Sequence, residues 1–133
     1  MEFKLPNNVI LTTAKQRSQE FINALNYLTT NHPVPTTRIE VTFYKKDGVN
    51  FKANADYNSA KWEGFFNPVI RVAYGSSGND PDAVKYLFHE YRHLIQDYEG
   101  RLTGYGDQPE LCVEADAWAI EQEKLFKAQQ EAL

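Results

Sequence analysis

Residues 80–100 constrain the fold most, because both ends of this stretch carry helix-boundary signals. Asp80 is a good N-cap residue, Pro81 is a good first helical residue, and Gly100 is typical of a helix C-terminus. Between these ends, apolar residues recur at helical spacing: Val84, Leu87, Phe88, Tyr91, Leu94, Ile95 and Tyr98. The pattern predicts a helix from Pro81 to about Glu99 with one apolar side.

Two further helices are predicted, one before and one after this stretch. Thr13 and Gln16 have the spacing of a capping box, so the first helix is expected to begin at Thr13 and to end before His32-Pro33. Pro109 opens the other helix. Its apolar positions are Leu111, Ala115, Trp118, Ala119, Leu125 and Phe126.

Three strands are expected between the first two helices. Apolar and polar residues alternate over 39–44 and again over 49–56, and Asp47-Gly48 between them favours a tight hairpin turn. Residues 69–74 read as a third strand. The order of helix, three strands, helix and helix predicts an α+β domain with a small, mostly antiparallel sheet.

Composition limits the class of protein and its partners. The 133 residues contain no repeat or linker, which favours a single domain over 1–133. The net charge of −4 and the lack of a basic stripe argue against nucleic acid as a partner. With one cysteine, Cys112, folding needs no oxidising compartment. No signal-peptide core or membrane-length apolar run is visible, so we expect a soluble, cytoplasmic protein that does not bind membranes.

His89 and His93 lie four residues apart on the helix predicted over 81–99, which places both imidazoles on one face. Two nitrogens at this spacing can bind one zinc ion. Glu90 follows His89 directly, where its carboxylate can take a proton from a zinc-activated water and pass it to a leaving amine. The alternative is a solvated surface pair of histidines, but the well-bounded helix favours a metal site.

A catalytic zinc ion needs a third protein ligand and one open position. Carboxylates on the helix that starts at Pro109 are the better candidates: Glu110, Glu114 and Asp116. Cys112 is also able to coordinate zinc, although a lone cysteine on such a helix is more often a small packed residue. His32, before Pro33, reads as a surface or turn residue.

The motif His89-Glu90-x-x-His93, followed by Glu114-Ala115-Asp116-Ala117-Trp118-Ala119, resembles the gluzincin-type zincin metallopeptidases, and most closely the small ImmA/IrrE-like proteins. The resemblance covers residues 69–122. It implies that Glu114 is the third zinc ligand. It also implies that residues 69–74 form an edge strand on which an extended substrate pairs.

The sequence departs from this family at two places. Arg92 stands where zincins often have Gly or Ala, and it either points away from the metal or holds a carboxylate. Glu110 and Glu114 are four apart, in place of the Glu-x-x-x-Asp pattern. Possible partners of the outer imidazole nitrogens are Asp116, Asp97 and Gln96. Tyr105 is a candidate donor to the developing oxyanion.

The expected function is therefore zinc-dependent hydrolysis of peptide bonds in a protein or peptide substrate. His89, His93 and Glu114 would bind Zn²⁺, with Glu90 as general base. One alternative is a catalytically silent zincin scaffold, acting as a binding, assembly or regulatory protein that retains zinc. The other is a helical interaction domain without metal, in which the motif arose by chance.

Overall fold

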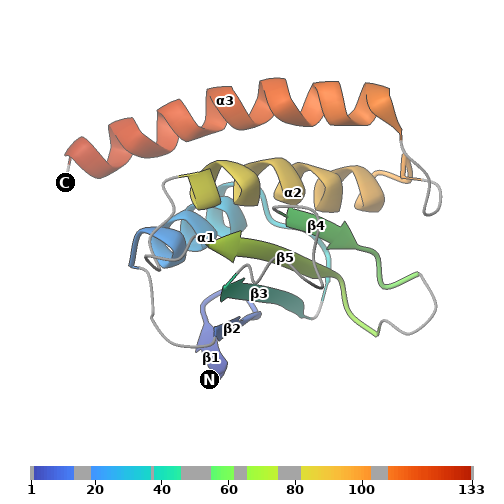
Figure 1. The fold of residues 1–133 in the computed structure, drawn as a ribbon, viewed down its shortest axis with the longest axis horizontal. Helices are drawn as coiled ribbons and strands as arrows, with labels where there is room; N and C mark the ends of the chain where they lie inside the picture. Colours follow the sequence, from blue (N-terminus) through green and yellow to red (C-terminus); the bar gives the residue numbers. More distant parts are fainter. Residues whose placement is uncertain are drawn as a thin grey trace.

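The computed structural model describes residues 2–13, 19–36, 38–45, 55–61, 66–74, 82–102 and 108–132. These residues form five strands and three helices in an α+β arrangement (Figure 1). In chain order they are β1 (Glu2–Leu5), β2 (Val9–Thr13), α1 (Gln19–Asn31), β3 (Ile39–Lys45), β4 (Ala55–Asn58), β5 (Val69–Tyr74), α2 (Asp82–Tyr98) and α3 (Pro109–Ala132).

The sheet is five-stranded and mixed, with the strand order β1-β2-β3-β5-β4. The central pairs β2–β3 and β3–β5 are parallel, whereas the outer pairs β1–β2 and β4–β5 are antiparallel. The predicted three-stranded, mostly antiparallel sheet is therefore wrong. The prediction missed the two N-terminal strands, β1 and β2. Asn7 and Asn8, both with a φ of 63°, turn the chain between them.

The predicted hairpin over 39–56 is also wrong. β5 lies between β3 and β4, so Val41 pairs with Ile70 and Tyr57 pairs with the same Ile70 from the other side. Ala55–Asn58 forms a strand at the end of the second predicted run, whereas Asp47-Gly48 and residues 49–54 of that run lie outside the described residues. The strand over 69–74 is confirmed, but it is internal. β4 is the edge strand on this side of the sheet.

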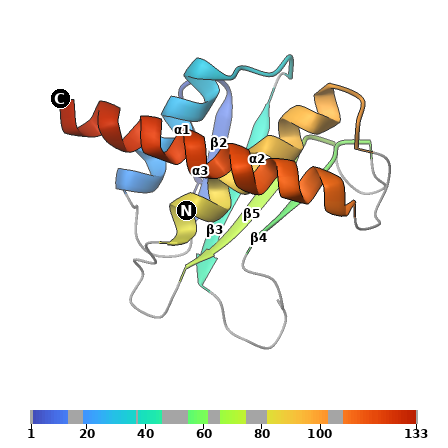
Figure 2. The ribbon, with the colours of Figure 1, turned by 90° about the horizontal axis from the view of Figure 1, so that it is seen from above.

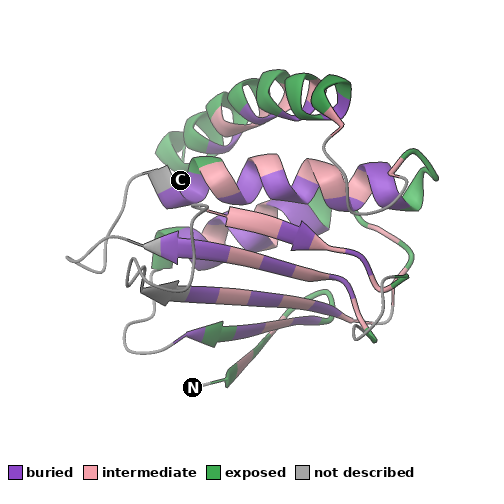
Figure 3. Cartoon of the chain, turned by 45° about the vertical axis from the view of Figure 1, so that its right-hand side comes forward, coloured by how far each residue is buried: buried purple, intermediate pink, exposed green. Residues whose placement is uncertain are grey.

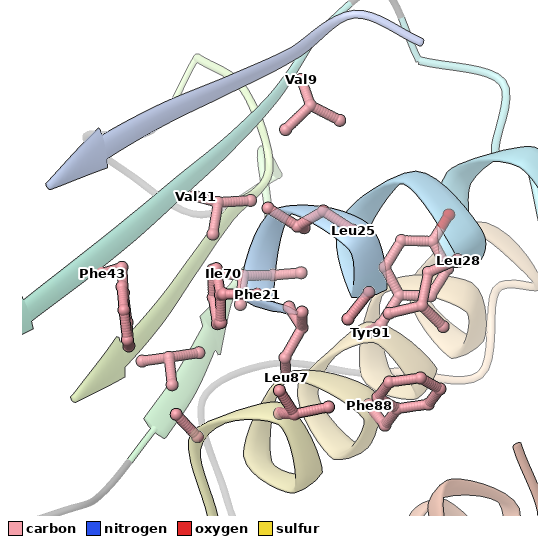
Figure 4. Packing of buried hydrophobic residues seen from close by; sticks show 14 of the residues in the cluster. Val9, Phe21, Leu25, Leu28, Val41, Phe43, Ile70, Leu87, Phe88 and Tyr91 are labelled. Atoms are coloured by element: carbon pink, nitrogen blue, oxygen red, sulfur yellow. The ribbon is translucent and has the colours of Figure 1, made fainter. Parts of the chain in front are cut away.

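Helices α1 and α2 cover one face of the sheet, and α3 lies over α2 (Figures 1 and 2). Buried side chains alternate with more exposed ones along β2, as expected for a sheet with one covered face (Figure 3). Side chains of the sheet, α1 and α2 meet in one core (Figure 4). Its fully buried members include Val9, Leu25, Leu28, Ile70, Leu87, Phe88 and Tyr91.

The predicted ends of α1 and α2 and the predicted start of α3 agree with the structure, whereas the predicted start of α1 does not. Asp80 and Pro81, the predicted start of α2, lie outside the described residues. Thr13 is a buried residue of β2, and α1 begins at Gln19. α2 ends as predicted before Gly100, whose φ of 79° allows its N–H to donate to the Asp97 carbonyl at 3.0 Å. α3 begins at Pro109. None of the helices in the described part of the chain is long and apolar enough to cross a membrane.

Candidate metal centre

The candidate centre lies between α2 and α3, which pack against each other in opposite directions (Figure 1). This packing sets Asp116 beside His89, and Cys112 beside His93 one helical turn away. The Nε2 atoms of His89 and His93 lie 3.1 Å apart, with the ring centroids 4.8 Å apart and the rings nearly perpendicular. The histidine pair expected from the sequence therefore converges on one point.

The outer nitrogens of both rings face oxygen atoms. His89 Nδ1 lies 2.7 Å from Asp116 Oδ1, and His93 Nδ1 lies 2.8 Å from Gln96 Oε1. The orientation of the Gln96 amide is set by its nitrogen, which donates to the Leu111 carbonyl at 3.1 Å and to Glu114 Oε2 at 2.6 Å. Both Nδ1 atoms must then carry the hydrogen and donate it. Asp116 and Gln96 thus occupy the positions expected of partners to metal-bound histidines.

This hydrogen bonding leaves the lone pair of each Nε2 available as an acceptor, and the two Nε2 atoms lie 3.1 Å apart. In neutral imidazoles each Nε2 is then an acceptor, and two acceptors at 3.1 Å repel unless a cation lies between them or one ring is protonated. Burial lowers the pKa of His93 and outweighs the hydrogen bond to Gln96, which raises it. A shared divalent cation is the arrangement that this donor pair fits.

A third donor lies beside the pair. Cys112 Sγ is 3.8 Å from His93 Nε2, and the ligand atoms of His89, His93 and Cys112 all lie within 4.8 Å of one another. With zinc–nitrogen distances of roughly 2.0–2.1 Å and zinc–sulfur of about 2.3 Å, tetrahedral geometry needs an N···N separation of about 3.3 Å and N···S of about 3.6 Å. The His89–His93 and His93–Cys112 separations of 3.1 and 3.8 Å each lie near these values, and the three ligand atoms together span no more than 4.8 Å.

Glu90 is the buried carboxyl group of the centre. It is 8% exposed, and its Oε1 lies 3.9 Å from His89 Nε2. Burial first, and the negative charges of Asp56 and Asp116 with it, raise the pKa of Glu90 to about 8. A carboxyl group with a pKa near neutrality is suited to accept and return a proton.

Glu114 is placed differently from the expectation drawn from the resemblance. Its carboxylate is held by Arg101 at 2.8 Å, by Arg92 at 3.3 Å and by the amide of Gln96. Hydrogen bonds with Arg101 first, and with Gln96 and Arg92, together lower the pKa of Glu114 to about 2. Glu114 is not in the three-residue group, and its role as a ligand stays a prediction.

The remaining candidates of the sequence lie around the centre or away from it. Arg92 holds a carboxylate, that of Glu114, and its guanidinium lies 5.5 Å from the centre of the Trp118 ring. Asp97 does not face a histidine. It accepts from the Tyr57 hydroxyl at 2.7 Å and pairs with Lys61 at 3.1 Å.

Two other residues considered from the sequence, His32 and Glu110, take no part in the described centre. His32 lies after α1, with Nε2 at 3.0 Å from Gln122 Oε1. Glu110 is exposed in the first turn of α3. Tyr105 lies outside the described residues.

The sequence favoured a packing role for Cys112 over a role as a metal ligand. Cys112 is exposed, and its neighbour across the helix pair is His93. The available signal was spacing: Cys112 and Asp116 are four apart on α3, as His89 and His93 are on α2. Using that signal requires the register between the two helices, which the sequence does not contain.

A pocket of about 500 Å³ opens beside His89 and Glu90. It is also lined by Ala55, Lys85, Tyr86, Asp116, Ala119 and Ile120. Ala55 belongs to β4, so the strand that borders the pocket is the antiparallel edge strand. The pocket therefore joins the buried carboxyl group of Glu90 to an open edge of the sheet.

Comparison of this chain with protein-family models, with curated proteins and with solved structures found no match.

Proposed function

We propose that this protein is a zinc-dependent peptidase in which His89 and His93 hold the metal and Glu90 is the general base. The observation that carries the proposal is the pair of Nε2 atoms, 3.1 Å apart, beside the buried carboxyl group of Glu90. Zinc, when bound, supplies a Lewis acid that polarises a carbonyl group and lowers the pKa of water to about 7.

The protein's own groups account for the proton transfers. Glu90 Oε1 takes a proton from the attacking water and delivers it to the leaving amine. Hydrogen bonds from the two Nδ1 atoms to Asp116 and Gln96 fix the imidazole tautomers, so that both Nε2 atoms stay available to the metal. Burial, which raises the pKa of Glu90, keeps this carboxyl group able to hold a proton near neutral pH between the two transfers.

The edge strand β4 supports a peptide as the substrate. Among the described strands, β4 pairs with β5 alone, and Ala55 at its start lines the pocket that contains Glu90. An extended peptide can add to such an edge through main-chain hydrogen bonds. We expected this role for residues 69–74, but that strand is internal, and the proposal therefore moves to β4.

The test is hydrolysis of a mixed peptide library by the zinc-loaded wild-type protein and by Glu90→Gln, with products followed by mass spectrometry. We expect Glu90→Gln to retain zinc and to lose at least about 100-fold in rate, because the proton acceptor is gone. Glu110→Gln, an exposed carboxyl group on α3, is the matched control and should hydrolyse as the wild type does.

Two results would contradict the proposal. Hydrolysis by Glu90→Gln at the wild-type rate would remove Glu90 from the mechanism. Zinc retention by the wild type without cleavage of any library member would favour the silent scaffold, in which the metal serves binding or stability.

A further inference from the structure

We infer that Cys112 is the third protein ligand of the metal, so that a thiolate from α3 completes the centre in place of a carboxylate. This inference rests on the metal site of the proposed function but not on its catalytic activity. It goes beyond that function because it assigns the chemical type of the centre, two imidazoles and one sulfur.

The first support is the position of the sulfur atom. Cys112 Sγ lies 3.8 Å from His93 Nε2, close to the separation of about 3.6 Å that a shared tetrahedral zinc ion requires. Across the described residues, these three side chains form the group whose ligand atoms gather within 4.8 Å.

The second support is that Cys112 and Asp116, both on α3, contact different nitrogen atoms of the histidine pair. Cys112 and Asp116 lie one turn apart and face the same histidine pair. Asp116 lies at 2.7 Å from the outer nitrogen of His89, which fixes that ring. Cys112 instead lies near Nε2 of His93, on the side where the two Nε2 atoms approach each other. The carboxylate therefore orients a ligand, and the sulfur stands where a ligand is needed.

The third support is the cost of using Glu114. Moving its carboxylate to the metal would break its ion pairs with Arg101 and Arg92. The Arg92 side chain is 17% exposed and its Nε has no hydrogen-bond partner, so losing Glu114 would leave a largely buried cation uncompensated. The same movement would release Gln96, whose orientation sets the tautomer of His93.

A thiolate ligand gives the centre a distinct chemistry. Together with two neutral imidazoles it leaves a zinc centre with a net charge of +1, and sulfur favours zinc or cobalt over the harder cations Mg²⁺ and Ca²⁺. A metal-bound thiolate is also shielded from alkylating reagents. Bound zinc should therefore slow the reaction of Cys112 with iodoacetamide.

Cobalt spectroscopy tests the assignment directly. We would load the wild type, Cys112→Ser, Glu114→Gln and the control Glu110→Gln with Co²⁺ and record absorption spectra. The wild type and both Glu variants should show a thiolate-to-cobalt charge-transfer band in the near ultraviolet, and Cys112→Ser should lack it. Zinc affinity should fall at least about 100-fold in Cys112→Ser, because loss of even an outer partner typically costs 10- to 100-fold. For Glu114→Gln the fall should be no more than about tenfold.

The outcomes separate this inference from the proposed function. A tetrahedral cobalt spectrum without the charge-transfer band in the wild type would overturn the thiolate assignment. So would loss of metal in Glu114→Gln with full affinity in Cys112→Ser. A wild-type protein that shows the band but cleaves no peptide would support Cys112 as a ligand and contradict the peptidase function. A protein that binds no cobalt at all would contradict both proposals. The wild-type spectrum needs no variant, so poor folding of Cys112→Ser leaves the test intact.

Discussion

Gln96 is the residue on which the orientation of His93 depends. It is fully buried, and its amide makes three contacts, to His93 Nδ1, to the Leu111 carbonyl and to Glu114. The amide has one acceptor and two hydrogens, and each is used once. The side chain therefore joins the histidine-bearing side of α2 to the start of α3, and replacing it removes several buried hydrogen bonds together.

We predict that Gln96→Leu lowers the free energy of unfolding of the metal-free protein by about 2–3 kcal/mol, because it leaves buried donors and acceptors unpaired. Urea unfolding in the presence of a chelator measures this change. Gln129→Leu, at an exposed position of α3, is the control and should shift stability by no more than about 0.5 kcal/mol. Equal stabilities of the two variants would show that the buried amide does not act as described.

The edge strand β4 and the C-terminal end of α2 are linked by contacts of one buried carboxylate, that of Asp97. Asp97 is 4% exposed, accepts a hydrogen bond from the Tyr57 hydroxyl of β4 and pairs with Lys61, which follows the strand. Burial raises the pKa of Tyr57, so its hydroxyl remains a donor at neutral pH. These contacts hold the short edge strand against the helix that carries both histidines, and so they fix the border of the pocket.

Tyr57→Phe should therefore destabilise the protein by about 1–3 kcal/mol, since the variant keeps the ring but leaves buried Asp97 without one donor. Thermal or urea unfolding measures the loss. Tyr98→Phe, which removes a hydroxyl from a residue 38% exposed at the end of α2, is the matched control. If both variants unfold alike, the link between β4 and α2 does not depend on this hydroxyl.

For the whole molecule, the contacts of Glu114 with Arg101, Arg92 and Gln96 predict how stability depends on pH. The pKa of Glu114 is about 2 in the folded chain against a reference value of 4.5, so the folded state holds this proton less tightly. The stabilisation from its contacts is complete above about pH 5. It is lost as the pH falls through 4.5 towards 2.

The prediction is that the stability difference between the wild type and Glu114→Gln, measured in a chelator, shrinks as the pH falls from 7 to 3. Urea unfolding at several pH values measures it. Glu110→Gln, which removes an exposed charge from the same helix, separates the local contacts from the change in net charge. A difference that stays constant over this range would contradict the assigned role of Arg101 and Arg92.

Local signals were sufficient to predict α2 and α3 but not the sheet. The boundaries at Gly100 and Pro109 depend on the conformations of those residues, and both were predicted correctly. The alternation that begins at Ile39 predicts a strand but does not identify the strand that pairs with it, because strand pairing joins residues far apart in the sequence. Thr13 was misplaced because a capping-box spacing also occurs by chance at the end of β2.

The same division applies to the candidate site. The spacing of His89 and His93 brings their nitrogens together within one helix, so the sequence contains this part of the site. The neighbours contributed by α3 depend on the register between two helices. The resemblance favoured Glu114 by type and position, but the arginines that hold its carboxylate become visible only in the folded chain.

A single unbroken helix connects the candidate centre to the opposite end of the molecule. The 24 residues of α3 span about 36 Å, with Cys112 and Asp116 near the start and Phe126 packed against Tyr27 and Phe88 near the end. Such a rod transmits tilt, because a small rotation about its anchored end displaces the far end by a larger distance. The start of α3 is held to α2 by Gln96 and Arg92, so any strain at the aromatic anchor would reach the sulfur and the imidazoles through those contacts.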